Sequence, residues 1–118
     1  MSGLPGNGES APIDRSELAE ISGGDQSLER EMLSVFRQAN DADAAALKEA
    51  LEKQDIASVT RLSHRVKGAS RMVGAITLAT ICGRIEHAGR ASDWGTIAAN
   101  REALYRELDR VNAYLSAL

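Results

Sequence analysis

The sequence predicts an all-α protein, an antiparallel four-helix bundle with a short additional helix at its N-terminus. From residue 13 onward, apolar residues recur three or four positions apart, and no segment shows the alternation or the β-branched richness of a strand. Short turns rich in glycine or aspartate separate these segments, which makes consecutive helices antiparallel neighbours. Aromatic residues are only 3% of the chain, so Leu, Ile, Val and Ala must build the core.

The composition indicates one domain with a loose start. Residues 1–12, MSGLPGNGESAP, are rich in Gly, Ser and Pro and lack periodicity, which predicts a flexible tail or linker before a domain at 13–118. The single cysteine, Cys82, excludes a disulfide framework, and its apolar sequence neighbours favour a small core side chain. No apolar run is long enough to span a membrane and no signal peptide is evident, so we expect a cytoplasmic setting.

The N-terminal half carries clear helix-boundary signals. Asp14 is the expected N-cap of a short helix that Gly23 ends. Asp25 then caps a long helix that we expect to run to residue 51. The polar stretch Asn-Asp-Ala-Asp at 40–43 is a candidate kink or break in it, but we expect one long helix with all four residues on its solvent face.

The second half divides into three helices. Asp55 is the expected cap of the first, and Gly74 stands where a C-terminal glycine would end it. Thr77 is the expected cap of the next helix. A turn from Gly89 to Trp94 then leads into the last helix, whose leucines keep helical spacing to residue 118.

The charge is distributed unevenly. The net charge of −3 combines a strongly acidic first part, residues 1–55, with residues 56–90, which hold six bases and one acid. Such a basic segment indicates an anionic partner, although a solvated face explains the charge equally well. Nucleic-acid binding is disfavoured by the sequence pI of about 5.4 and by the scarcity of aromatic residues that could stack on bases.

The stretch LSHRVKGASRMVG, residues 62–74, contains a histidine on the polar side of its helix. On a helical wheel His64 lies roughly 160° from Val66, the centre of the apolar face. Gly68 is one turn further on, where a larger side chain would lean over the histidine. A helix-interior glycine costs about 1 kcal/mol relative to alanine, which makes sense if something large must reach His64.

The neighbours of His64 suit transient capture of a phosphoryl group. An exposed imidazole is a fair nucleophile at neutral pH, and Lys67 and Arg71 on the same side supply positive charge. Metal binding is weaker, because no carboxylate shares this face and the other histidine, His87, is on another helix and is expected to be merely solvated. A hydrolytic triad is also weak, since nothing on this face orients the ring.

These residues resemble a known family. LSHRVKGASRMVGAITLATICGRIEHAGR resembles the signature of histidine-containing phosphotransfer (HPt) domains, a His-x-x-Lys-Gly core followed by small residues and a later glycine. The resemblance covers roughly residues 13–118. It implies a phosphorelay intermediate that accepts a phosphoryl group on Nε2 of His64 from a receiver-domain aspartyl phosphate and passes it to another receiver aspartate.

The resemblance also implies roles for the neighbours of His64. Lys67 would balance the phosphoryl charge and Gly68 would give the receiver access. Glu86 stands where the family often has a glutamine bonded to Nδ1 of the histidine, and a carboxylate would also accept that proton. Supporting contacts are expected from Arg90, with Arg71 and Ser70 nearby.

The partners follow from the same resemblance. We expect receiver domains and a hybrid histidine kinase, with Mg²⁺ on the receiver and no cofactor or metal in this chain. No nucleotide loop or kinase signature is present, so we expect a stoichiometric carrier without ATP-dependent autophosphorylation. We expect a monomer without nucleic-acid or direct membrane contact, either free-standing or the C-terminal domain of a membrane-anchored sensor kinase.

The alternative function is a helical docking module that binds receiver or kinase domains without phosphotransfer, which a His64→Gln variant would separate from a carrier.

The sequence also indicates where a receiver would dock. Ala57 and Thr60 lie on the His64 side, and a short N-terminal helix with Leu18 and Ile21 offers a candidate apolar patch beside it.

Overall fold

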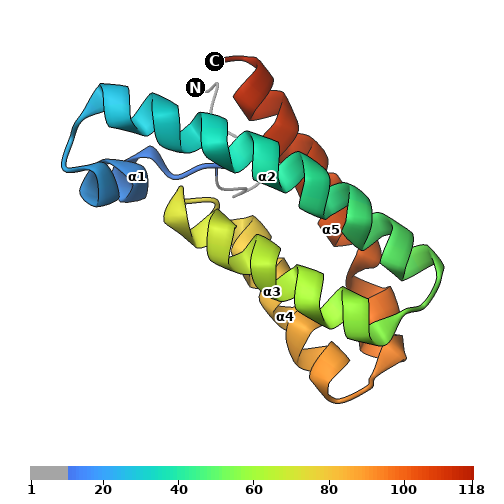
Figure 1. The fold of residues 1–118 in the computed structure, drawn as a ribbon. Helices are drawn as coiled ribbons and strands as arrows, with labels where there is room; N and C mark the ends of the chain where they lie inside the picture. Colours follow the sequence, from blue (N-terminus) through green and yellow to red (C-terminus); the bar gives the residue numbers. More distant parts are fainter. Residues whose placement is uncertain (1–10) are drawn as a thin grey trace, which may run out of the picture.

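The computed structural model describes residues 11–118, which form five helices and contain no strand (Figure 1). The helices are α1 (Arg15–Ser22), α2 (Gln26–Glu52), α3 (Ile56–Met72), α4 (Ile76–Arg90) and α5 (Trp94–Ser116). The all-α prediction is confirmed. The linker expected at residues 1–12 lies almost entirely outside the described residues.

Helices α2 to α5 form the bundle, and α1 lies across one end of it (Figure 1). Each of α2, α3 and α4 packs against the next helix in sequence, and α5 returns to α2. The core between them is almost wholly aliphatic, as the scarcity of aromatic residues requires. Its fully buried side chains include Leu47, Leu51, Val59, Val66, Leu78, Ile85, Ile97, Leu104, Leu108 and Val111.

Aspartates cap most of the helices. The Asp14 carboxylate accepts the backbone N–H groups of two residues of α1, and Asp25, Asp55 and Asp93 each accept one N–H in the first turn of their helices. A side-chain acceptor here satisfies a backbone donor that the helix itself leaves unpaired. The caps expected at Asp14, Asp25 and Asp55 are therefore confirmed. Asp93, which was not predicted as a cap, is the N-cap of α5.

The start of α4 differs from expectation. Its N-cap is Ala75, which makes no side-chain capping bond, and Thr77 is already the second helical residue, so the predicted Thr77 cap was wrong. The reason is the tight turn at Gly74, whose φ of +80° lets the helical chain resume two residues later. At its other end α4 continues through Gly89 to Arg90, so the predicted turn begins later than expected.

Helix α2 is continuous, as expected, but its polar stretch is not all on the solvent face. Asn40 is only 2% exposed, because it follows Phe36 and precedes Ala44 by one turn each and so shares their inward stripe. Asp43 is partly buried beside α3 and forms an ion pair with Arg65, with 3.3 Å between Oδ1 and Nη2. The expected placement of Asn40 was therefore wrong.

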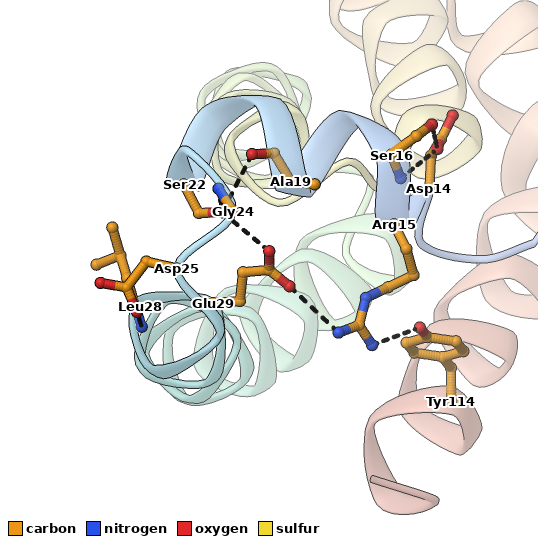
Figure 2. A network of polar contacts seen from close by, with 10 residues as sticks. All are labelled: Asp14, Arg15, Ser16, Ala19, Ser22, Gly24, Asp25, Leu28, Glu29 and Tyr114. Carbon is orange, nitrogen blue, oxygen red and sulfur yellow. Dashed lines mark hydrogen bonds and ion pairs between the residues drawn. The ribbon is translucent and has the colours of Figure 1, made fainter.

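A polar network fixes α1 to the bundle (Figure 2). Arg15 lies 3.3 Å from the buried carboxylate of Glu29 on α2 and donates a hydrogen bond of 3.0 Å to Tyr114 on α5. The hydroxyl of Ser22 donates to the other oxygen of Glu29 at 2.9 Å. Leu18 is fully buried beneath α1, so it does not belong to a surface patch; Ile21, 46% exposed, does reach the surface.

Candidate functional site

His64 lies in the middle of α3, on the side away from the core. Val59, Leu62 and Val66 of the same helix are buried, whereas 62% of the His64 side chain is exposed. The helical spacing that places the three apolar residues inward thus turns the imidazole outward, as expected from the wheel.

Gly68 leaves the surface beside the ring uncovered. A β-carbon added at this position would meet no other atom within 4 Å. The packing of the domain therefore does not require a glycine here. An alanine would fit and would favour the helix, so the reason for the glycine lies outside the domain's own packing.

The carboxylate that orients the ring comes from the neighbouring helix. Glu86 of α4 is buried, with 5% of its side chain exposed, and its Oε2 lies 2.9 Å from Nδ1 of His64. The two residues are 22 positions apart and meet only because α3 and α4 pack side by side. Nε2 forms no hydrogen bond to any residue in the described part of the chain.

Two cations share the same carboxylate. The Lys67 ammonium lies 2.6 Å from Oε1 of Glu86, and the Arg90 guanidinium lies 2.5 Å from Oε2. Both residues were expected to face a phosphoryl group on His64, and here both instead contact Glu86. The Lys67 side chain is 21% exposed and that of Arg90 67%, so the lysine is enclosed and the arginine is open to solvent.

These contacts keep Glu86 ionised. The Lys67 ammonium is the main cause that lowers the pKa of the Glu86 carboxyl from 4.5 to about 2; burial opposes this, and Arg90 and His64 add to it. An ionised carboxylate only accepts hydrogen bonds, so the Nδ1 atom facing it must carry the proton. In the neutral ring the lone pair is then on Nε2, which is the nucleophilic form of that atom.

The remaining residues singled out by sequence lie around this cluster. Arg71 is exposed on α3, whereas Ser70 is fully buried and makes no hydrogen bond to the cluster. Cys82 is buried, which raises its pKa to about 12, as befits an inert core thiol. His87 is exposed on α4.

No group of His, Cys, Asp and Glu side chains among residues 11–118 is arranged to hold a metal ion. None of their helices combines the length and apolar character that crossing a membrane demands.

The helical bundle and its exposed histidine agree with the resemblance to histidine phosphotransfer domains. The family model of the Hpt domain matches residues 31–117, and the chain belongs to this family. It therefore has a phosphotransfer role in a phosphorelay, and domains of this family work with receiver domains and kinases of two-component systems.

Individual relatives agree with this assignment. The chain is 31% identical over 74 residues to the sensor protein GacS of Pseudomonas syringae pv. syringae, a match that covers 63% of this chain but 8% of that protein. In fold it resembles histidine-containing phosphotransfer protein B (HptB) of Pseudomonas aeruginosa, with a TM-score of 0.80 and 23% identity. That superposition covers 92% of this chain and 95% of HptB.

Proposed function

We propose that this domain carries a phosphoryl group on Nε2 of His64, received from the aspartyl phosphate of one receiver and delivered to the aspartate of another. The observation that carries the proposal is the contact between Nδ1 of His64 and the ionised Glu86, which leaves Nε2 as the exposed nucleophile. The open surface at Gly68 supports it, because a receiver must bring its acidic pocket to within bonding distance of the ring.

The chemistry needs only these groups from the bundle. The Nε2 lone pair attacks phosphorus, the bond from phosphorus to the aspartyl oxygen breaks, and the receiver carboxylate leaves. Positive charge that develops on the ring is shared through Nδ1–H with Glu86, which makes the carboxylate a source of electrostatic stabilisation. In the second transfer a receiver aspartate attacks phosphorus and the bond to Nε2 breaks. We place the Mg²⁺ on the receivers and expect no ATP-dependent autophosphorylation.

An apolar groove between α2 and the end of α3, two helical turns from His64, is our proposed docking surface for the receiver. Along α3 each of the residues His64, Gly68 and Met72 is one helical turn from the next. Because Met72 lines the groove, the groove begins next to the surface that Gly68 leaves uncovered. It has a volume of about 250 Å³, and Val35 and Met72 on its rim are 62% and 60% exposed. Its lining residues are Met32, Val35, Phe36, Ala39, Ala69, Met72 and Val73. A Met72→Glu variant should weaken receiver binding in a titration, and unchanged affinity would remove this surface from the proposal.

The decisive experiment is the intact mass of the domain after incubation with Mg²⁺ and receivers charged by acetyl phosphate. We expect the wild type to gain one acid-labile phosphoryl group and His64→Gln to gain none. A gain on the His64→Gln variant would exclude His64 as the carrier. No gain with any receiver that binds the domain would instead favour a docking module without transfer.

The glycine beside the ring provides a second test. Gly68→Ala should raise the free energy of unfolding by about 0.5–1 kcal/mol, because alanine favours the helix and meets no neighbour. The same variant should slow phosphoryl transfer at least severalfold, because the added methyl lies where the receiver approaches. Gly95→Ala, in the first turn of α5 with only an ordinary 3.5 Å contact, is the matched control and should transfer normally.

We further propose in which protein, in which compartment and in which oligomeric state the domain acts. The match to a sensor protein leads us to propose that it serves a hybrid sensor kinase, as a domain of it or beside it. We also propose that it acts in the cytoplasm as a monomer. Analytical ultracentrifugation of the domain at micromolar concentration tests the last point, and a dimer would contradict it.

A further inference from the structure

Glu86 stands midway between two glycines of α4, in the sequence Gly-Arg-Ile-Glu-His-Ala-Gly at 83–89. Each glycine faces a side chain of α3. A β-carbon at Gly83 would make an ordinary contact of 3.5 Å with Cδ of Lys67. A β-carbon at Gly89 would overlap Oγ1 of Thr60 and lie only 3.1 Å from its Cβ. The two positions therefore differ: an alanine fits at 83 and does not fit at 89.

The contact between Gly89 and Thr60 lies one helical turn from the His64–Glu86 pair. Thr60 precedes His64 by four residues, and Gly89 follows Glu86 by three. Because α3 and α4 run antiparallel, these two contacts are neighbours in the same helix–helix interface. The separation of the helices at the Gly89–Thr60 contact consequently determines the distance between His64 and Glu86.

Thr60 is a rigid partner for this purpose. Its side chain branches at Cβ, which restricts its rotamers in a helix, and its hydroxyl donates a hydrogen bond of 2.8 Å to the carbonyl of Ile56. Turning the hydroxyl away from an enlarged residue 89 would break this bond and would still leave Cβ of Thr60 only 3.1 Å from the added β-carbon, so the contact favours a larger separation of the helices. If the helices moved apart by about 1 Å at His64 and Glu86, the hydrogen bond between Nδ1 and Glu86, which is 2.9 Å long, would be lost.

We propose that Gly89 and Thr60 are positioning residues, whose close contact sets the separation of α3 and α4 at which Glu86 holds Nδ1 of His64. The consequence for phosphotransfer rests on the proposed function of His64; the positioning itself does not. Helix propensity gives no reason for a glycine at 89, the last but one residue of α4, because alanine is favoured over glycine in a helix.

The test is ¹⁵N NMR of the imidazole rings at alkaline pH, with His64→Gln for assignment. In the wild type we expect His64 as the Nδ1–H tautomer, with the exposed His87 as an internal reference for a solvated ring. Gly89→Ala should move the His64 signals toward the tautomer mixture of His87. Gly83→Ala, the same change on the same helix three residues from Glu86, should leave the His64 signals unchanged.

A second variant distinguishes positioning from general damage. Thr60→Ala combined with Gly89→Ala removes the overlap with the hydroxyl, and the two β-carbons then need to move apart by only a few tenths of an ångström. This double variant should regain the Nδ1–H signature, and should also regain most of a transfer rate that Gly89→Ala lowers severalfold. If Gly89→Ala does not fold, the double variant must fold and show the signature.

Three results would overturn the proposal: a wild-type His64 without the Nδ1–H tautomer, a Gly89→Ala variant with wild-type signals, or a double variant that does not regain them. The tautomer measurement needs no receiver. A domain that shows the expected tautomer shifts and takes up no phosphoryl group would therefore refute the proposed function and leave the positioning role standing.

Discussion

Replacing Glu86 by glutamine should remove a pH dependence of stability that can be calculated from the site. The carboxylate is buried, and its pKa is lowered to about 2 chiefly by the Lys67 ammonium. The glutamine side chain has a similar shape and keeps an oxygen that accepts the proton of Nδ1. The substitution therefore removes the charge while it preserves most of the packing and the ring contact.

The direction of the effect follows from the two pKa values. The folded-state pKa of about 2 lies below the ordinary value of 4.5, so ionised Glu86 stabilises the fold fully above about pH 4.5. That stabilisation is lost as the pH falls through 2. At about 1.4 kcal/mol per pKa unit the difference is worth about 2–3 kcal/mol, since the exposed Arg90 and His64 are partly screened by water.

The assay is urea unfolding followed by far-UV circular dichroism at pH 5, 4, 3 and 2. The free energy of unfolding of the wild type, minus that of Glu86→Gln, should fall by about 2–3 kcal/mol over this range, because the capping aspartates cancel in the difference. Glu102→Gln, at an exposed ion pair with Arg106, is the control and should show a constant difference. A constant difference for Glu86→Gln as well would refute the assignment of Glu86 as a strongly stabilised carboxylate.

Two further predictions concern α1 and the turn that it covers. Gly74→Ala should lower the free energy of unfolding by about 2–4 kcal/mol, because its φ is +80° and a β-carbon would lie 2.6 Å from the carbonyl oxygen of the α1 N-cap. Gly23→Ala, also at positive φ but with no atom nearby, should lose only about 1 kcal/mol in the same urea titration. Arg15→Ala should cost about 1 kcal/mol and speed amide exchange in α1, because it leaves the buried Glu29 without its cation. Arg106→Ala, at an exposed pair, should change neither measurement, and equal effects of the two arginine variants would contradict the role of the network in Figure 2.

The helix boundaries were predictable wherever a local signal decides them. Asp25 and Asp55 cap their helices through their own side chains, and Gly74 ends α3 because few other residues adopt its backbone angles. The prediction of Thr77 as an N-cap was wrong for another local reason: threonine is a good capping residue, but the turn at Gly74 lets α4 begin before it. Capping propensity shows where a helix can start, but the geometry of the preceding turn decides where it does start.

The outward position of His64 was predictable because it depends on helical spacing alone. The partners of the site were not predictable in this way. Lys67 is three residues from His64 along α3, which suggested that it would face an anion on the ring. In the structure its ammonium crosses to Glu86, and only the packing of α3 against α4 reveals this contact. The burial of Asn40 has the same origin, since the inward stripe of α2 overrides the polarity of the side chain.

The charges of the cluster indicate different roles for its two cations, Lys67 and Arg90. One carboxylate meets two cations, so the site has a surplus of positive charge before a phosphoryl group arrives. By analogy with phosphorylated side chains, that group brings a charge of about −1.5 to −2. Arg90, 67% exposed, can turn toward it by side-chain rotation alone, whereas the enclosed Lys67 stays beside Glu86. In the proposed mechanism Lys67 then keeps the carboxylate ionised and the proton on Nδ1 during both transfers, so the phosphoryl group would enter and leave Nε2 without any proton having to move within the bundle.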